Sequence, residues 1–266
     1  MPLEKHLMRR YAQVMLNQIA HGTPTANPAL LIVHGLYGSG RNWGVIAKRL
    51  SDERQVIAVD QRNHGYSPCY DSHSYEDMAE DLAAVIRAHG APMDVLGHSM
   101  GGKAAMVLAL KYPDLVNRLI VADIAPVSYG HSQIEYIKAM KAIDLNAITK
   151  RSDAEAQLRS MIDDPILPVF FTQSLDVPAK KWRLNLDVLA QEMPKILSFP
   201  QIGGQFAKPV LFLTGGASHD VTPDHRDTIK ALFPNTKFAK IPGAGHWLHA
   251  EKPREFEAAV RTWLNM

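Results

Sequence analysis

The chain has 266 residues, of which 46% are apolar and 21% charged, and its net charge is +2 with its 12 histidines counted as neutral. This composition is that of a folded globular protein and excludes a disordered chain. The nearly balanced charge also gives no sign of nucleic acid or an anionic membrane as a partner.

Cys69 is the only cysteine, which excludes an intramolecular disulfide and a cysteine-based metal cluster. A single cysteine suits a reducing compartment. The first residues lack the apolar stretch of a signal peptide. No apolar run reaches the roughly 18 residues of a transmembrane helix. We therefore expect a cytoplasmic protein without a membrane span. We further expect a monomer or homodimer.

Short apolar runs alternate with stretches of helical periodicity, which predicts an α/β fold with a mostly parallel sheet. Residues 8–19 alternate loosely and would form an antiparallel edge strand or hairpin. The expected strands after it are 30–33, 56–59, 93–96, 119–122, 210–213 and a weaker 237–241. The expected helices are 42–50, 75–89, 103–112, 222–233 and 254–265. Several strands are apolar throughout, so we expect helices on both faces of the sheet.

Residues 128–205 depart from this alternation. They have helical texture at 134–143, 153–162 and 184–193, five prolines and no convincing strand. We predict a helical cap over 128–205, inserted into a core formed by residues 1–127 and 206–266. An insertion at the carboxyl end of a strand lies over the crevice where open α/β sheets bind ligands. The alternative is that the inserted helices have no role in the choice of substrate.

Two groups of cap residues bear on the substrate, and each has two interpretations. One group would line an acyl pocket or simply pack: Phe170, Phe171, Leu175, Trp182 and Leu186. The other would meet a phosphate-bearing substrate or form a solvated basic face: Lys180, Lys181 and Arg183.

Residues 97–101, Gly-His-Ser-Met-Gly, match the pattern G-x-S-x-G. They follow an expected strand and precede an expected helix, which is the context of a nucleophile elbow. The two glycines leave room for the sharp turn. The start of the helix directs backbone N–H groups toward developing negative charge. The pattern predicts Ser99 as a nucleophile and the Met100 N–H as one oxyanion donor.

His246 is the best candidate for the base that a serine nucleophile needs. It lies in a glycine-containing loop between the last expected strand and the C-terminal helix. The loop at 34–40 lacks the spacing of a phosphate-binding loop and would supply the Leu36 N–H as the second oxyanion donor. His34 and His64 are expected to hold loops by hydrogen bonds. The side chain of His98 is expected to point away from the site.

Five motifs stand out along the chain: H-G-L-Y-G-S from residue 34, D-Q-R-N-H-G-Y-S from 60, G-H-S-M-G-G-K-A from 97, D-I-A-P from 123 and G-A-G-H-W-x-H-A-E-K-P from 243. Together they resemble the α/β-hydrolase superfamily and, more narrowly, the bacterial YbfF-type esterases. The resemblance covers almost all of the chain after residue 28. It implies a doubly wound sheet of about eight strands with a helical cap. It also implies serine-dependent hydrolysis of a small-molecule acyl ester or acyl-CoA thioester, with no metal or organic cofactor.

Two residues are candidates for the acid that orients the histidine. In most of the superfamily the acid follows the strand at 210–213, but here Ser218 occupies that position and Asp220 lies two residues further on. Asp123 follows the strand at 119–122. The YbfF-type pattern places the acid at Asp123 and keeps a supporting serine at Ser218, so the resemblance favours Asp123 and leaves Asp220 open. Asp60 precedes Ser99 and is expected to hold the loop at 62–64.

The leading hypothesis is a carboxylic ester hydrolase that forms an acyl-enzyme. The alternatives are a serine-dependent hydrolase of carbon–carbon bonds or lactones, and a non-catalytic ligand-binding member of the superfamily. The chain carries both Ser99 and His246, which favours an enzyme.

Overall fold

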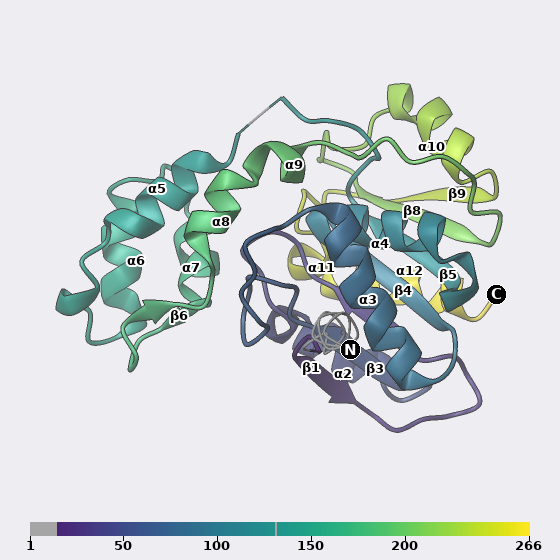
Figure 1. Ribbon diagram of the computed structural model, residues 1–266, viewed down its shortest axis with the longest axis horizontal. Coiled ribbons are helices and arrows are strands. Elements are labelled where there is room, and N and C mark those ends of the chain that lie inside the picture. Colours follow the sequence, from purple (N-terminus) through teal and green to yellow (C-terminus); the bar gives the residue numbers. More distant parts are fainter. Residues whose placement is uncertain (1–14, 131) are drawn as a thin grey trace, which may run out of the picture.

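The computed structural model describes residues 15–130 and 132–266, whose strands form one seven-stranded sheet in the order β1-β3-β2-β4-β5-β8-β9 (Figure 1). The strands are β1 Gln18–His21, β2 Leu30–Val33, β3 Val56–Val59, β4 Met93–His98, β5 Val116–Ala122, β8 Val210–Gly215 and β9 Thr236–Ile241. β1 is antiparallel to β3, and the other pairs are parallel. The predicted α/β fold is confirmed, with seven sheet strands in the described residues where about eight were expected. The antiparallel edge strand predicted over 8–19 is observed only as β1, and residues 8–14 lie outside the described part.

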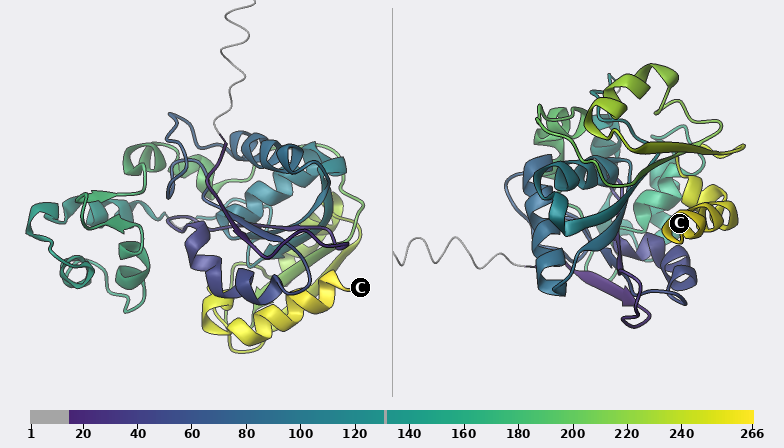
Figure 2. Two further views of the ribbon diagram at one scale, coloured as in Figure 1. Left: turned by 90° about the horizontal axis from the view of Figure 1, so that it is seen from below. Right: turned by 90° about the vertical axis from the view of Figure 1, so that its right-hand side faces the viewer.

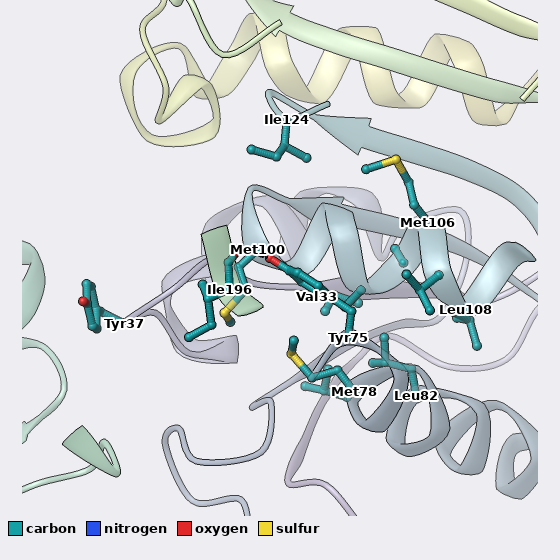
Figure 3. Close-up of a cluster of buried hydrophobic side chains, with 14 of the residues drawn as sticks. Val33, Tyr37, Tyr75, Met78, Leu82, Met100, Met106, Leu108, Ile124 and Ile196 are labelled. Carbon is teal, nitrogen blue, oxygen red and sulfur yellow. Dashed lines mark hydrogen bonds between the residues drawn. The ribbon is translucent and has the colours of Figure 1, made fainter. Parts of the chain in front are cut away.

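Helices cover both faces of the sheet, as the apolar strands predicted. α3 (Tyr75–His89) and α4 (Met100–Lys111) pack on one face, and α2 (Gly44–Leu50) and α12 (Pro253–Leu264) pack on the other (Figure 2). Successive residues of β2 alternate between the two core clusters, because neighbouring side chains of a strand point to opposite faces. In Figure 3, side chains of α3 lie between that helix and α4. The strands are therefore held rigidly, and so are the loops at their ends.

Local capping fixes the bounds of α3, which are those predicted. The Ser74 hydroxyl accepts a hydrogen bond from the Asp77 N–H at the first turn. Gly90 ends the helix in the left-handed conformation, with φ 87°, which glycine adopts without strain.

The segment between β5 and β8 stands apart from the sheet in Figure 1. Its helices are α5 Ile134–Ala142, α6 Arg151–Arg159, α7 Leu167–Thr172, α8 Leu186–Gln191 and α9 Met193–Leu197. The expectation of no strand here is wrong, because β6 (Leu175–Asp176) pairs with β7 (Lys181–Trp182) as a short antiparallel ribbon. Two-residue strands are too short to give a periodic pattern. The division into a cap at 128–205 and a core stays a prediction.

The remaining helices lie near the C-terminus and in short turns. They are α10 Arg226–Leu232, α11 Leu248–Glu251 and the 3-10 turns Gly40–Trp43, Pro113–Leu115, Leu145–Ala147 and Pro223–His225. Across the described residues, helices fall short of the length and apolarity needed to span a bilayer.

Backbone and side-chain hydrogen bonds join the cap segment to loops of the core. The Gly65 N–H donates to the Arg183 carbonyl at 2.8 Å, and the Asn185 N–H donates to the Asn63 carbonyl at 2.9 Å. The Ser174 hydroxyl donates to the Tyr37 carbonyl, also at 2.9 Å. These contacts hold the cap segment against loops on the side of the sheet where β2 ends.

Candidate active site

The residues singled out in the sequence meet at the carboxyl ends of neighbouring parallel strands. Ser99 directly follows β4, Asp123 directly follows β5, and His246 lies in the loop after β9. The Ser99 N–H donates to the Ala122 carbonyl at 3.0 Å, and the Asp123 N–H donates to the Leu213 carbonyl at the same distance. The sheet thus continues to the residues of the site and fixes their backbones.

Ser99 has the strained backbone of a nucleophile elbow. Its φ of 53° and ψ of −123° lie in a region that residues other than glycine rarely adopt. A Cβ at residue 97 would lie 2.3 Å from the Gly101 carbonyl oxygen, so the turn itself requires Gly97. A Cβ at residue 101 would lie 2.3 Å from the Val33 carbonyl oxygen. Gly101 is therefore required by the close approach of β2, and not only by the turn.

Both candidate acids contact the histidine. His246 Nδ1 lies 2.9 Å from Asp123 Oδ2 and 3.0 Å from Asp220 Oδ2. Asp123 is fully buried, and its Oδ1 accepts a hydrogen bond from the Gly215 N–H at 2.9 Å. The Ser218 hydroxyl donates to Asp123 Oδ2 at 2.5 Å. The serine in the usual acid position therefore contacts the carboxylate that the resemblance favoured.

Opposing effects set the pKa of His246. Burial lowers the pKa of this imidazole, but hydrogen bonds and charge from Asp123 and Asp220 outweigh burial and raise the pKa to about 9. The imidazolium form is therefore favoured at neutral pH.

His98 also takes part in the site, which corrects the expectation that its side chain points away. Its Nε2 lies 2.9 Å from the carbonyl oxygen of His246, and the two rings are 4.8 Å apart. Burial holds the pKa of His98 well below its usual value, so the ring is neutral and donates from Nε2. The partner is a backbone atom 148 residues away, and no sequence motif signals such a contact.

The expected structural roles of three other residues are confirmed. His34 and His64 accept hydrogen bonds from the N–H groups of Gln61 and Tyr37, respectively. Asp60 accepts from the N–H groups of residues 40 and 66 and so holds the loop around 62–64.

Two cavities meet at Ser99 and His246. The larger has a volume of about 330 Å³ and is lined by aromatic side chains, and the smaller has a volume of about 100 Å³. Phe170 and Phe171 line the larger cavity, whereas the other three residues proposed for an acyl pocket belong to the apolar core. The basic residues 180, 181 and 183 line neither cavity.

Lys103 is a buried residue of the smaller cavity that the sequence reasoning missed. Its side chain is 1% exposed, and Nζ donates to the carbonyls of Val127, Leu197 and Ser198. Burial lowers its pKa to about 7, against the opposing charge of Asp220. The lysine thus joins α4 to both ends of the cap segment. Its place in the motif after Ser99 was the available signal.

His246, Asp123 and Asp220 also have the spacing of metal ligands, since one ligand atom from each lies within 4.8 Å of the others. His246 Nδ1 already hydrogen-bonds to Asp123 and lies 3.0 Å from Asp220, and Asp123 is further held by Gly215 and Ser218. A histidine–carboxylate relay accounts for the arrangement without an ion.

Several known proteins with similar sequences and structures are named as esterases or lipases. The family profile described as "alpha/beta hydrolase fold" matches residues 28–253. The chain is 42% identical to mouse (Mus musculus) sn-1-specific diacylglycerol lipase ABHD11 over 248 residues, covering 89% of this chain and 81% of the lipase. It is 37% identical to esterase YbfF of Escherichia coli strain K12 over 241 residues, covering 90% and 94%.

A solved structure also resembles this chain along most of its length. The solved structure described as "Marine microorganism esterase" superposes with a TM-score of 0.88 at 39% identity, covering 94% of this chain and 99% of that chain. The elbow, the strand order and these similarities agree: the chain belongs to the α/β-hydrolase fold family.

Proposed function

We propose that this protein hydrolyses carboxylic esters through an acyl-enzyme on Ser99, with His246 as the base and Asp123 as the acid. The observation that carries the proposal is the hydrogen bond from His246 Nδ1 to the fully buried Asp123, with His246 and Ser99 lining the same cavities. Ester hydrolysis also agrees with the esterases and lipases that the chain resembles.

In the reaction, Nε2 of neutral His246 takes the proton of the Ser99 hydroxyl while Oγ attacks the ester carbonyl carbon. The tetrahedral intermediate then expels the alcohol, which takes the proton from Nε2. Water repeats the sequence on the acyl-enzyme and releases the acid. Asp123 keeps the Nδ1 proton in place and stabilises the imidazolium that forms in each half.

The Leu36 and Met100 N–H groups are the proposed oxyanion donors. Within the described residues, the hydrogen bonds leave both N–H groups without a protein acceptor. Met100 is also the first residue of the 12-residue helix α4, whose N-terminus favours negative charge. These features suit the stabilisation of a carbonyl oxygen as it becomes negative.

The two cavities suit an ester with unequal sides. An aromatic-lined cavity of about 330 Å³ accepts a bulky apolar group, and the cavity of about 100 Å³ accepts a small one. Because Lys180, Lys181 and Arg183 line neither cavity, the phosphate of an acyl-CoA has no partner among them. We therefore favour an oxygen ester over an acyl-CoA thioester. A cytoplasmic location, which rests on composition, and a monomeric or homodimeric state are also part of this proposal.

The test is hydrolysis of chromogenic esters of increasing acyl length, with matched thioesters in parallel. We expect a burst of one product equivalent per active site for the wild type, and no burst for Ser99→Ala. Absence of ester turnover in folded wild-type protein would contradict the proposal. Faster turnover of the thioester series would contradict the oxygen-ester preference.

A further inference from the structure

Two carboxylate oxygens face one ring nitrogen of His246. Asp123 Oδ2 is 2.9 Å from Nδ1 and Asp220 Oδ2 is 3.0 Å from it, yet Nδ1 carries a single proton. The N–H hydrogen-bonds to Asp123, and the Asp220 carboxylate lies within ion-pair distance of the same nitrogen. We propose that Asp220 is a second carboxylate partner of His246, a positioning residue that acts together with Asp123. This inference rests on the proposed role of His246.

The two carboxylates have different surroundings, which gives them different tasks. Asp123 is completely buried and fixed by the Gly215 N–H and the Ser218 hydroxyl. The Asp220 side chain is 23% exposed and lines the smaller cavity. Asp123 thus orients the ring rigidly, while Asp220 adds charge from the solvent-accessible side.

Tyr129 fixes Asp220 in place. Its hydroxyl donates to the Asp220 carbonyl at 2.6 Å and accepts from the Ala125 N–H at 2.9 Å. Ala125 lies two residues after Asp123. One phenol therefore joins the two loops that carry the acids. The Asp220 N–H also lies 3.2 Å from the Ser218 hydroxyl oxygen, so the loop is held at both ends of the residue.

Glu251 binds the backbone N–H groups of residues 245 and 247, on either side of His246, and not the ring itself. Three other titratable groups nearby carry no negative charge. His98 contacts it from β4, and burial keeps this ring neutral. His249, in α11, has its pKa lowered to about 3 by burial and by the charge of His246. Lys103 from α4 faces Asp220. Within the described part of the chain, the negative charge at this ring comes from Asp123 and Asp220.

The consequence is a histidine that is a stronger base than one carboxylate would make it. Removing one of two charges at hydrogen-bonding distance lowers a histidine pKa by about 1 or more. Asp220→Asn should therefore lower the pKa of His246 while Asp123 still orients the ring. A residue with a merely structural role would not move this pKa.

The experiment is an NMR titration of the histidine rings in the full-length protein, which does not depend on turnover. We compare the wild type, Asp220→Asn and the control Asp224→Asn, an exposed aspartate four residues further along. We expect the His246 pKa to fall by about 1 or more in Asp220→Asn and to stay at the wild-type value in Asp224→Asn. An unchanged His246 titration in folded Asp220→Asn would overturn the proposal.

Activity gives a second readout. We expect Asp123→Asn to retain at least tenfold more kcat than the double variant Asp123→Asn/Asp220→Asn, because one carboxylate still faces Nδ1. Equal kcat for the single and double variants, with folding confirmed by circular dichroism, would also overturn it. If the wild type hydrolyses no ester, the proposed function fails, and the titration still decides whether Asp220 acts on His246.

Discussion

Nε2 of His98 donates a hydrogen bond to the carbonyl oxygen of His246, 2.9 Å away, so the residue before the nucleophile holds the backbone of the residue proposed as its base. β4 thereby fixes two members of the site at once. Ser99 is placed by the covalent turn, and the His246 loop is placed by the His98 ring.

Replacing His98 with Leu tests this contact. Leaving the part-buried carbonyl of His246 without its donor costs about 1 kcal/mol, and we expect Tm and kcat to fall together. The measurements are thermal unfolding and steady-state kinetics, with His89→Leu, outside the site at the end of α3, as the control. A His98→Leu enzyme with wild-type kcat would mean that the loop does not need this bond.

The pH dependence of activity follows from the raised pKa of His246. Only the neutral ring can take the proton of Ser99, and the ring becomes neutral as the pH rises through about 9. We expect kcat/KM for a neutral ester to increase about tenfold per pH unit on the acid side of that value. If kcat/KM already reaches a plateau at pH 7, the pKa of His246 is not raised and the prediction is wrong.

The free energy of unfolding should fall as the pH rises through the pKa of His246, whereas activity should rise. The pKa of His246 in the folded state, about 9, lies above the value of 6.5 for a free histidine. Its contribution to the free energy of unfolding is therefore complete below pH 6.5 and is lost as the pH rises through about 9. The measurement is chemical denaturation of the wild type and His246→Gln at pH 6 and pH 10. The difference between the two proteins should shrink at the higher pH, and a constant difference would speak against the linkage.

The close approach of α4 to β2 makes Gly101 irreplaceable. A methyl group there would lie 2.3 Å from the Val33 carbonyl oxygen, and overpacking of this kind costs typically about 1–3 kcal/mol. Gly44→Ala is the matched control, because nothing lies within 4 Å of a Cβ at that helical position. We expect Gly101→Ala to lower the free energy of unfolding and Gly44→Ala to leave it unchanged or raise it. Equal stability of the two variants would refute the packing argument.

Local signals in the sequence predicted much of the fold. The helix at 75–89 was predicted to the residue, because Ser74 and Gly90 mark its ends chemically. The helix predicted over 222–233 is instead a 3-10 turn, Pro223–His225, followed by α10. Thr222 and His225 form a capping box at the start of this turn, close to the predicted start of the helix. The β6–β7 ribbon could not be predicted, because two-residue strands are too short to show a periodic hydrophobic pattern.

The residues proposed for catalysis could be predicted because each follows an expected strand, and parallel strands end at one edge of the sheet. The choice between Asp123 and Asp220 could not be made from the residues alone. It depends on where two side chains from different loops meet one nitrogen, and the structure places both there. The role of His98 rests on a contact with a backbone carbonyl, which carries no sequence signal. Lys103 also binds backbone carbonyls, and its only signal in the sequence is its place in the motif after Ser99.

The nucleophile is the central claim, and covalent labelling tests it most directly. The wild type, Ser99→Ala and His246→Ala are treated with a fluorophosphonate, and the modified peptide is identified by mass spectrometry. We expect one adduct per chain, on Ser99, formed orders of magnitude more slowly in His246→Ala and absent in Ser99→Ala. An adduct on another serine of the wild type, or an undiminished adduct in Ser99→Ala, would contradict the account.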